Sequence, residues 1–292
     1  MRIVLVHGIN NQGVSAAWII EKWLAALGTK LSAADRALVA QQEIVAPYYG
    51  DVLYEQTEGL TEAKGQLTPQ AAGDVEGDEA AFYRNVLTQV AKEAKIPQVL
   101  IDNAVDVVAN TPGIVEQGPI FHNRNIIAIA QVIETISPFH GKVLLRVLPQ
   151  AFVYLNRVQA TKAVDDIVRP ELEKGPCIVI AHSLGTIVTF KLMRQLKQVS
   201  PFYLTIGSPL AIQAVQGPIG TPFGRRPAVD RWLNVYDRDD FVTIGKPLDS
   251  TTFGGGIANV EVDNGQDDPH DFAMYLAHQS IADKVVAAIK AG

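Results

Sequence analysis

Residues 177–185 read Cys-Ile-Val-Ile-Ala-His-Ser-Leu-Gly, so an apolar run leads directly into a serine. The first four residues have the pattern of a strand buried on both faces of a parallel sheet, and the residues from about 185 to 197 have the pattern of a helix. A sharp turn between the two would lift Ser183 out of the sheet, and the small residues Ala181 and Gly185 would let that turn close. The stretch therefore predicts a strand, a tight turn and a helix, with Ser183 as a candidate nucleophile. The alternative is a serine that caps the helix by chance.

The same alternation of strands and helices extends to both sides of this unit. Ile3 to Val6 is a second continuous apolar run, and Ser15 is placed to cap a helix that Gly28 would end. Strands that alternate with helices predict an α/β fold, with a mostly parallel central sheet flanked by helices. The expected strands are 3–6, 43–46, 177–180, 202–206, 232–236 and 257–262. The expected flanking helices are 15–28, 160–173, 185–197 and 271–290, with a loop over 208–229.

The middle of the chain breaks this alternation. Residues 55 to about 120 are rich in Gly, Glu, Gln and Ala and contain one expected helix, Asp78 to Lys95. Residues 123–158 are strongly apolar with a helical period, and breaks are expected at Ser137-Pro138 and near Pro149. We interpret 55–158 as a largely helical insertion that packs over the sheet edge as a cap or lid. A buried structural subdomain is the alternative.

Composition and charge narrow the class of protein. The 292 residues are 48% apolar and 19% charged, which is typical of a globular chain with a large core. The net charge is -6 and the basic residues are scattered, so no nucleic-acid partner is indicated. No signal peptide is recognisable, and the longest apolar stretches fall short of a membrane span. Cys177, the only cysteine, excludes an internal disulfide. We therefore expect a soluble, cytoplasmic protein, with peripheral contact with a membrane and the oligomeric state left open.

No pattern for a metal ion or a cofactor is found in the sequence. Zinc-ligand spacing is absent, and Gly254 to Gly256 lacks the lysine of a phosphate-binding loop. The loop 263–268 has a calcium-like composition but not the spacing of an EF-hand, so a plain turn is expected. The expectation is a protein with neither a metal ion nor a cofactor.

The serine motif and three further stretches resemble the α/β-hydrolase superfamily, in particular its lipase- and esterase-like members. His7-Gly8-Ile9-Asn10 is similar to the oxyanion loop of that family, 205–210 to the end of one of its strands, and 234–242 to the strand and loop that carry its acid. The resemblance covers most of residues 1–50 and 175–290, and it implies one α/β-hydrolase domain over 1–292. Ala181 replaces the usual first glycine of the serine motif, and none of the usual leading strands of the fold is expected before the strand at 3–6.

A serine hydroxyl becomes a strong nucleophile only beside a histidine that takes its proton and a carboxylate that orients the histidine. The resemblance implies the chain order serine, acid, histidine. His270, in a loop before the last expected helix, is the favoured base over His278, which is expected inside that helix. For the acid, Asp240 matches the family's aspartate-x-valine pattern and Asp237 is the alternative.

The resemblance also implies two backbone donors for the oxyanion, the N–H groups of Ile9 and Leu184, with Asn10 shaping the loop beside them. His182 is expected to point away from the nucleophile and to be structural. The expected activity is hydrolysis of a carboxylic ester, with a small-molecule or lipid ester as substrate, by a Ser-His-Asp acyl-enzyme mechanism. The alternatives are a phospholipase or thioesterase acting on lipid-like substrates, or a binding protein that keeps the fold without catalysis.

Overall fold

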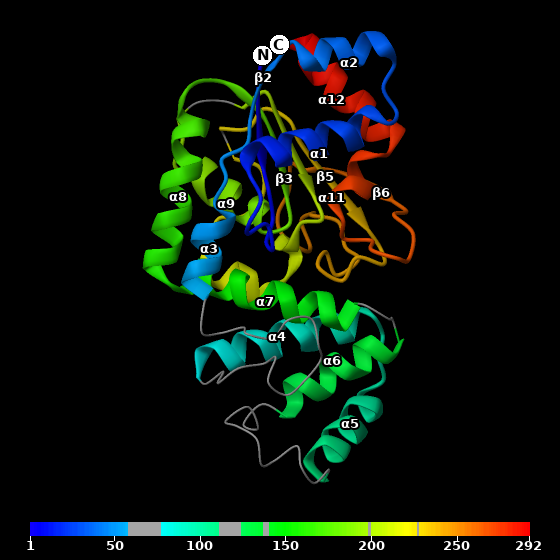
Figure 1. Ribbon diagram of the computed structural model, residues 1–292. Coiled ribbons are helices and arrows are strands. Elements are labelled where there is room, and N and C mark those ends of the chain that lie inside the picture. Colours follow the sequence, from blue (N-terminus) through cyan, green and yellow to red (C-terminus); the bar gives the residue numbers. More distant parts are fainter. Residues whose placement is uncertain (58–76, 111–123, 137–139, 198–199, 227) are drawn as a thin grey trace.

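The computed structural model describes residues 1–57, 77–110, 124–136, 140–197, 200–226 and 228–292 (Figure 1). The break expected at Ser137-Pro138 therefore lies outside the described residues, as do two stretches of the expected insertion, 58–76 and 111–123.

A six-stranded, open and fully parallel sheet forms the centre of the molecule, in the order β2-β1-β3-β4-β5-β6. Val4 pairs with Val179, and Ile180 pairs with Leu204, so the most apolar runs of the sequence lie side by side in the middle. The α/β class and the parallel sheet expected from the sequence are confirmed. The strands are β1 Arg2–Val6, β2 Glu43–Val45, β3 Cys177–His182, β4 Phe202–Ile206, β5 Trp232–Asp237 and β6 Ala258–Val262.

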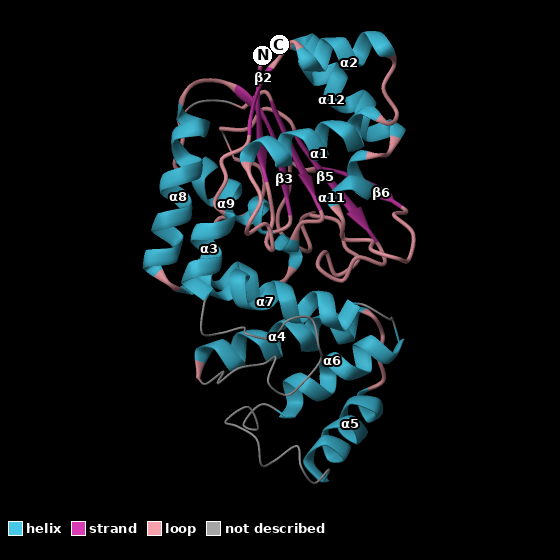
Figure 2. Cartoon of the chain, viewed as in Figure 1, coloured by secondary structure: helices cyan, strands magenta, loops and turns pink. Residues whose placement is uncertain are grey.

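Helices cover both faces of the sheet, because successive strand side chains point to opposite faces and both sets are apolar (Figure 2). On β1, Ile3 and Leu5 belong to one buried cluster, whereas Val4 and Val6 belong to the other. The first cluster is covered by α1 Ala16–Gly28, α11 Phe272–Leu276 and α12 Gln279–Ala291, with α2 Ala33–Ala40 packed on α12. The second is covered by α3 Gly50–Thr57, α8 Val158–Glu173 and α9 Leu184–Met193.

In the described part of the middle segment, four helices lie beyond the carboxyl ends of the strands, and α7 is the one of them nearest to the sheet (Figure 1). Their bounds are α4 Asp78–Glu93, α5 Gln98–Asn110, α6 Arg124–Ile136 and α7 His140–Asn156. Their buried side chains are continuous with the cluster on the α8 and α9 face of the sheet. The expected break near Pro149 is wrong, since α7 continues through this residue. The buried neighbours Leu148, Ala151 and Phe152 supply packing that offsets the hydrogen bond lost at the proline.

Two further expectations near the C-terminus are corrected. The single helix expected over 271–290 is two helices, because the backbone is extended at His278, which precedes α12. The loop expected over 208–229 contains a 3-10 turn, Pro209–Ala211, and the helix α10 Gln213–Ile219. Both are anchored by buried side chains such as Leu210 and Val215. Among the described residues, none of the helices has both the length and the apolar character needed to cross a membrane.

Candidate active site

Ser183 lies in the turn between β3 and α9, with backbone angles of φ 52° and ψ -126°. A non-glycine residue rarely adopts this left-handed conformation, and such strain persists where the surroundings enforce it. The Ser183 N–H donates to the carbonyl of Ile206 at the end of β4 (3.2 Å), and the Ser183 carbonyl accepts from the Thr186 N–H (2.9 Å). The turn is therefore held from the sheet and from the helix, and Ser183 as a whole residue is 1% exposed.

Glycines make room for this turn at two places. A Cβ atom at Gly185 would lie 2.3 Å from the Val6 carbonyl oxygen, so only glycine lets α9 start directly against β1. A Cβ atom at Gly8 would lie 2.7 Å from Cβ of Ser183, so the loop after β1 runs directly along the serine. The close approach of Gly185 to β1 explains why the 177–185 motif ends in glycine. The close approach of Gly8 to Ser183 brings the loop after β1 to the same site.

We expect Gly185→Ala to lower the free energy of unfolding by about 3 kcal/mol, because the added methyl group meets backbone atoms that cannot move aside. Urea denaturation measures this. Gly217→Ala, inside α10 where nothing lies within 4 Å of the new Cβ, is the matched control and should stabilise the protein by about 0.5 kcal/mol. Equal stability of the two variants would contradict the close approach of α9 to β1.

His270, in the loop before α11, contacts both the serine and an acid. Its Nε2 lies 2.9 Å from the Ser183 Oγ and its Nδ1 lies 2.8 Å from the Asp240 Oδ2. A carboxylate can only accept, so Nδ1 carries the proton and Nε2 is left to accept the hydrogen bond of the Ser183 hydroxyl. The structure thus brings together the three residues that the sequence pointed to, in one hydrogen-bonded chain.

The two candidate acids have different surroundings. The Asp240 carboxylate is fully buried and also accepts from the Tyr275 hydroxyl (2.7 Å) and the Val242 N–H (2.8 Å). The Asp237 carboxylate instead accepts from the N–H groups of Asp239 and Asn264 and shapes its own loop. Of the two, Asp240 is the one hydrogen-bonded to His270.

Electrostatics favours a basic His270. Burial by itself lowers the pKa of His270, but the negative charge and hydrogen bond of Asp240, helped by Asp268 and Asp271, outweigh burial and raise this pKa above its ordinary value. Next to it, burial and the charge of His270 hold the pKa of His182 well below its ordinary value. The neutral His182 donates from Nε2 to the His270 carbonyl (2.8 Å), so it anchors the histidine loop and is not hydrogen-bonded to the serine.

Two residues that hold the site were not anticipated from the sequence. The Tyr275 hydroxyl donates to Asp240 and accepts from the Asp237 N–H (3.2 Å), so it ties the end of β5 and the loop after it to α11. Asn264, in the loop expected to be a plain turn, donates to the Pro269 carbonyl (2.7 Å) and pairs with the His278 ring (2.9 Å). His278 therefore braces the His270 loop from behind and does not reach the serine.

The two expected oxyanion donors follow neighbouring strands. Ile9 follows β1 and Leu184 follows β3. These two strands are neighbours, and from them the strand order runs to β2 on one side and to β4 on the other. Such a switch point, at the carboxyl ends of the strands, is where open parallel sheets bind ligands. The His7 ring accepts from the Tyr49 N–H at Nε2 (3.2 Å), so its Nδ1 is the donor to the Gly8 carbonyl (2.7 Å). Because that carbonyl belongs to the same peptide plane as the Ile9 N–H, its hydrogen bond fixes the direction of this N–H.

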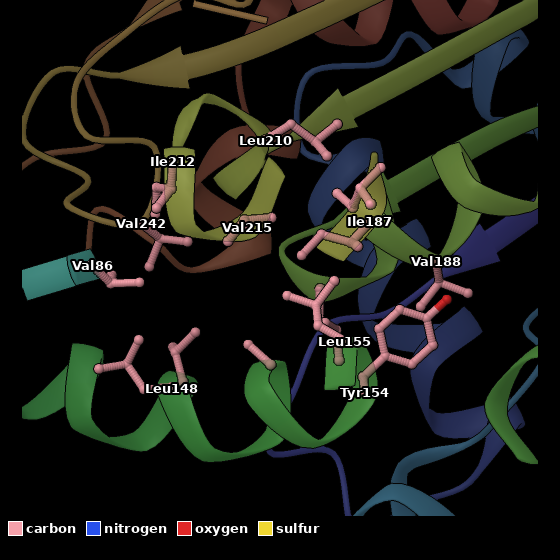
Figure 3. Close-up of a cluster of buried hydrophobic side chains, with 14 of the residues drawn as sticks. Val86, Leu148, Tyr154, Leu155, Ile187, Val188, Leu210, Ile212, Val215 and Val242 are labelled. Atoms are coloured by element: carbon pink, nitrogen blue, oxygen red, sulfur yellow. The ribbon is translucent and has the colours of Figure 1, made fainter. Parts of the chain in front are cut away.

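An apolar cavity of about 20 Å³ lies between the middle helices and the residues that follow the strands. Phe82 and Val86 of α4 and Leu148 of α7 line one side, and Leu184 and Val242 line the other. Leu184 follows the serine directly, and Val242 is two residues past Asp240. Figure 3 shows buried hydrophobic side chains around this cavity, with Val86 and Leu148 pointing toward Val242 and Val215. The cavity has room for about one water molecule, so in this state the apolar side chains fill the space themselves.

In the part of the chain that the structure describes, three or more His, Cys, Asp or Glu side chains do not gather as they would around a metal ion. Comparison of the sequence with protein-family models and with curated proteins gave no match.

Proposed function

We propose that this protein is a serine hydrolase of the α/β-hydrolase type that cleaves carboxylic esters through an acyl-enzyme. The observation that carries the proposal is the hydrogen-bonded chain from Ser183 through His270 to the buried Asp240, at a strained turn that begins a helix. An activated nucleophile needs such a base and such an orienting group within hydrogen-bond reach. The strained turn also supports an active site at Ser183, because backbone strain at a non-glycine residue destabilises the fold and is found mainly at functional sites.

In the proposed reaction the Ser183 Oγ attacks the ester carbonyl carbon as His270 Nε2 takes the hydroxyl proton. The carbonyl oxygen becomes an oxyanion that the N–H groups of Leu184 and Ile9 stabilise, while Asp240 stabilises the imidazolium. His270 then gives its proton to the departing alcohol oxygen, which leaves the acyl group on Ser183. A water molecule, deprotonated by the same histidine, hydrolyses the acyl-enzyme and restores the serine.

The apolar cavity beside Leu184 supports a substrate with a hydrophobic acyl group. We propose that the helices α4 and α7 act as a cap over this acyl site. Because the cavity has room for only about one water molecule, an acyl chain longer than a single methyl group enters it only if the cap moves away from the sheet. The buried Ser183 also favours one second candidate, a binding protein that keeps the fold and covers its serine.

Labelling with a fluorophosphonate tests the proposal against that second candidate. We expect one covalent adduct, which peptide mass spectrometry places on Ser183, and no adduct on His270→Ala, because the probe reacts only with an activated serine. A p-nitrophenyl ester series from acetate to decanoate then measures the acyl preference. A folded protein that takes up no probe and hydrolyses no ester would exclude the hydrolase and favour the binding protein.

The rate of labelling should depend on pH through His270. The histidine acts as a base only when neutral, and Asp240 raises its pKa despite burial, so the second-order labelling rate should rise with pH to a plateau. We expect the midpoint of this rise above pH 6.5, the ordinary value for histidine. Labelling reactions quenched at a series of times, between pH 5 and 9, give the rate constant at each pH and hence the midpoint. A rate that does not change over this range would be inconsistent with His270 as the base.

A further inference from the structure

Gln150 is a buried polar side chain of the middle helices that reaches the loop after β1. It lies on α7, directly after Pro149, and its Oε1 accepts from the Asn10 N–H at 3.1 Å. The two residues are 140 positions apart in the chain, so this bond joins the proposed cap to the loop that carries Ile9. A buried amide oxygen keeps such a position when it accepts a hydrogen bond, since an unpaired one costs stability.

The bond acts on a peptide next to the proposed oxyanion donor. Asn10 has φ 56°, so the chain turns sharply directly after Ile9. The peptide between Ile9 and Asn10 is held at both ends: its carbonyl accepts from the Asn11 Nδ2 (2.8 Å) and its N–H donates to Gln150. The preceding peptide is held at the Gly8 carbonyl by His7. Two of these three contacts come from residues of the loop itself, and only the bond from Gln150 comes from outside it.

We infer that Gln150 is a positioning residue for the Ile9 N–H, and that it makes a complete oxyanion site depend on α7 being seated against the sheet. This inference rests on the proposed hydrolase function. When α7 moves away, the Asn10 N–H loses its acceptor and the peptide after Ile9 can rotate. Small displacements of a group that stabilises the transition state are costly, because a 1 Å misplacement can lower the rate by about 10²-fold.

The chain offers a matched control in Gln89 on α4. Its Oε1 accepts from the Gln213 N–H (2.9 Å) and its Nε2 donates to the Ala211 carbonyl (3.3 Å). Gln89 therefore also joins a helix of the proposed cap to a loop of the sheet through its side-chain amide. Gln89 makes two such bonds where Gln150 makes one, and it binds residues 211–213 after β4 and not the loop that carries Ile9.

The test compares Gln150→Met with Gln89→Met, using p-nitrophenyl acetate, whose acyl group is too small to need the apolar cavity. We expect Gln150→Met to lower kcat by roughly tenfold with KM within about twofold, because the bond matters only when the oxyanion forms. The affinity for a trifluoromethyl ketone, which forms an oxyanion on the serine, should fall by the same factor as kcat/KM. Gln89→Met should leave kcat and this affinity close to those of the wild type.

Three results would overturn the inference. An unchanged kcat in Gln150→Met, or equal losses in both variants, would reduce Gln150 to one of several cap contacts. If Gln150→Met does not fold, Gln150→Ala, which leaves room for water, repeats the comparison, and failure of both to fold would make Gln150 a purely structural residue. A wild-type protein that takes up no fluorophosphonate is a separate result, because it rejects the hydrolase function and the inference with it.

Discussion

Ser183→Ala should lower kcat for ester hydrolysis by about 10⁶-fold, the size of loss that removal of a serine nucleophile causes in hydrolases of this mechanism. His270 and Asp240 cannot act without the hydroxyl, because the base has no proton to take and no acyl-enzyme can form. The variant should keep the fold, since the Ser183 backbone bonds to Ile206 and Thr186 do not involve the side chain that is removed. Hydrolysis of p-nitrophenyl butyrate and fluorophosphonate uptake measure the loss.

Ser200→Ala is the matched control for this change. Ser200 is likewise a buried serine, but its hydroxyl donates to the carbonyl of Cys177 (2.7 Å), at the opposite end of β3 from Ser183. Its removal should lower the free energy of unfolding by about 1 kcal/mol and leave kcat unchanged. Activity that survives in Ser183→Ala and is lost in Ser200→Ala would remove Ser183 from the reaction.

The parallel sheet could be predicted from the sequence because each central strand is a short run that is apolar on both faces. Such runs form strands with little dependence on the rest of the chain, and the alternation with helices leaves few arrangements open. The errors concern boundaries that tertiary contacts decide. The last helix divides because His278 is held by Asn264, and α7 passes Pro149 because it is buried on both sides of the proline. Neither cause is visible in hydrophobic periodicity.

In the candidate site too, local features could be predicted from the sequence, whereas features that depend on tertiary contacts could not. The serine turn is a local feature, since its requirement for small residues and a following helix is written in consecutive positions. The choice between Asp237 and Asp240 is not local, because it depends on which carboxylate the loop turns toward His270. The contacts of Tyr275 and Gln150 with the site are harder still to predict from the sequence. Each looks like an ordinary helix residue until the fold places its polar atom beside a loop more than 30 positions away.

Replacing Asp240, the aspartate hydrogen-bonded to His270, should have the second largest effect on kcat. Asp240→Asn should lower kcat by about 10⁴-fold, because an asparagine neither stabilises the imidazolium nor fixes the proton of His270 on Nδ1. The same change removes the main influence that raises the pKa of His270. Burial, which lowers it, is then opposed only by Asp268 and Asp271, so the midpoint of the pH profile should move to lower pH. A profile of kcat/KM against pH measures both effects.

Asp237→Asn should behave differently, although the residue is three positions away. Its carboxylate accepts from two backbone N–H groups, and an amide that replaces one oxygen by a donor loses one of these bonds. We expect a loss of about 1–2 kcal/mol in the free energy of unfolding, with kcat within about threefold of the wild type and an unmoved pH midpoint. If Asp237→Asn instead gave the 10⁴-fold loss and Asp240→Asn only a loss of stability, the acid of the site would be Asp237. The loop after β5 would then have to turn during the reaction, because in this structure the one of the two carboxylates bonded to His270 is Asp240.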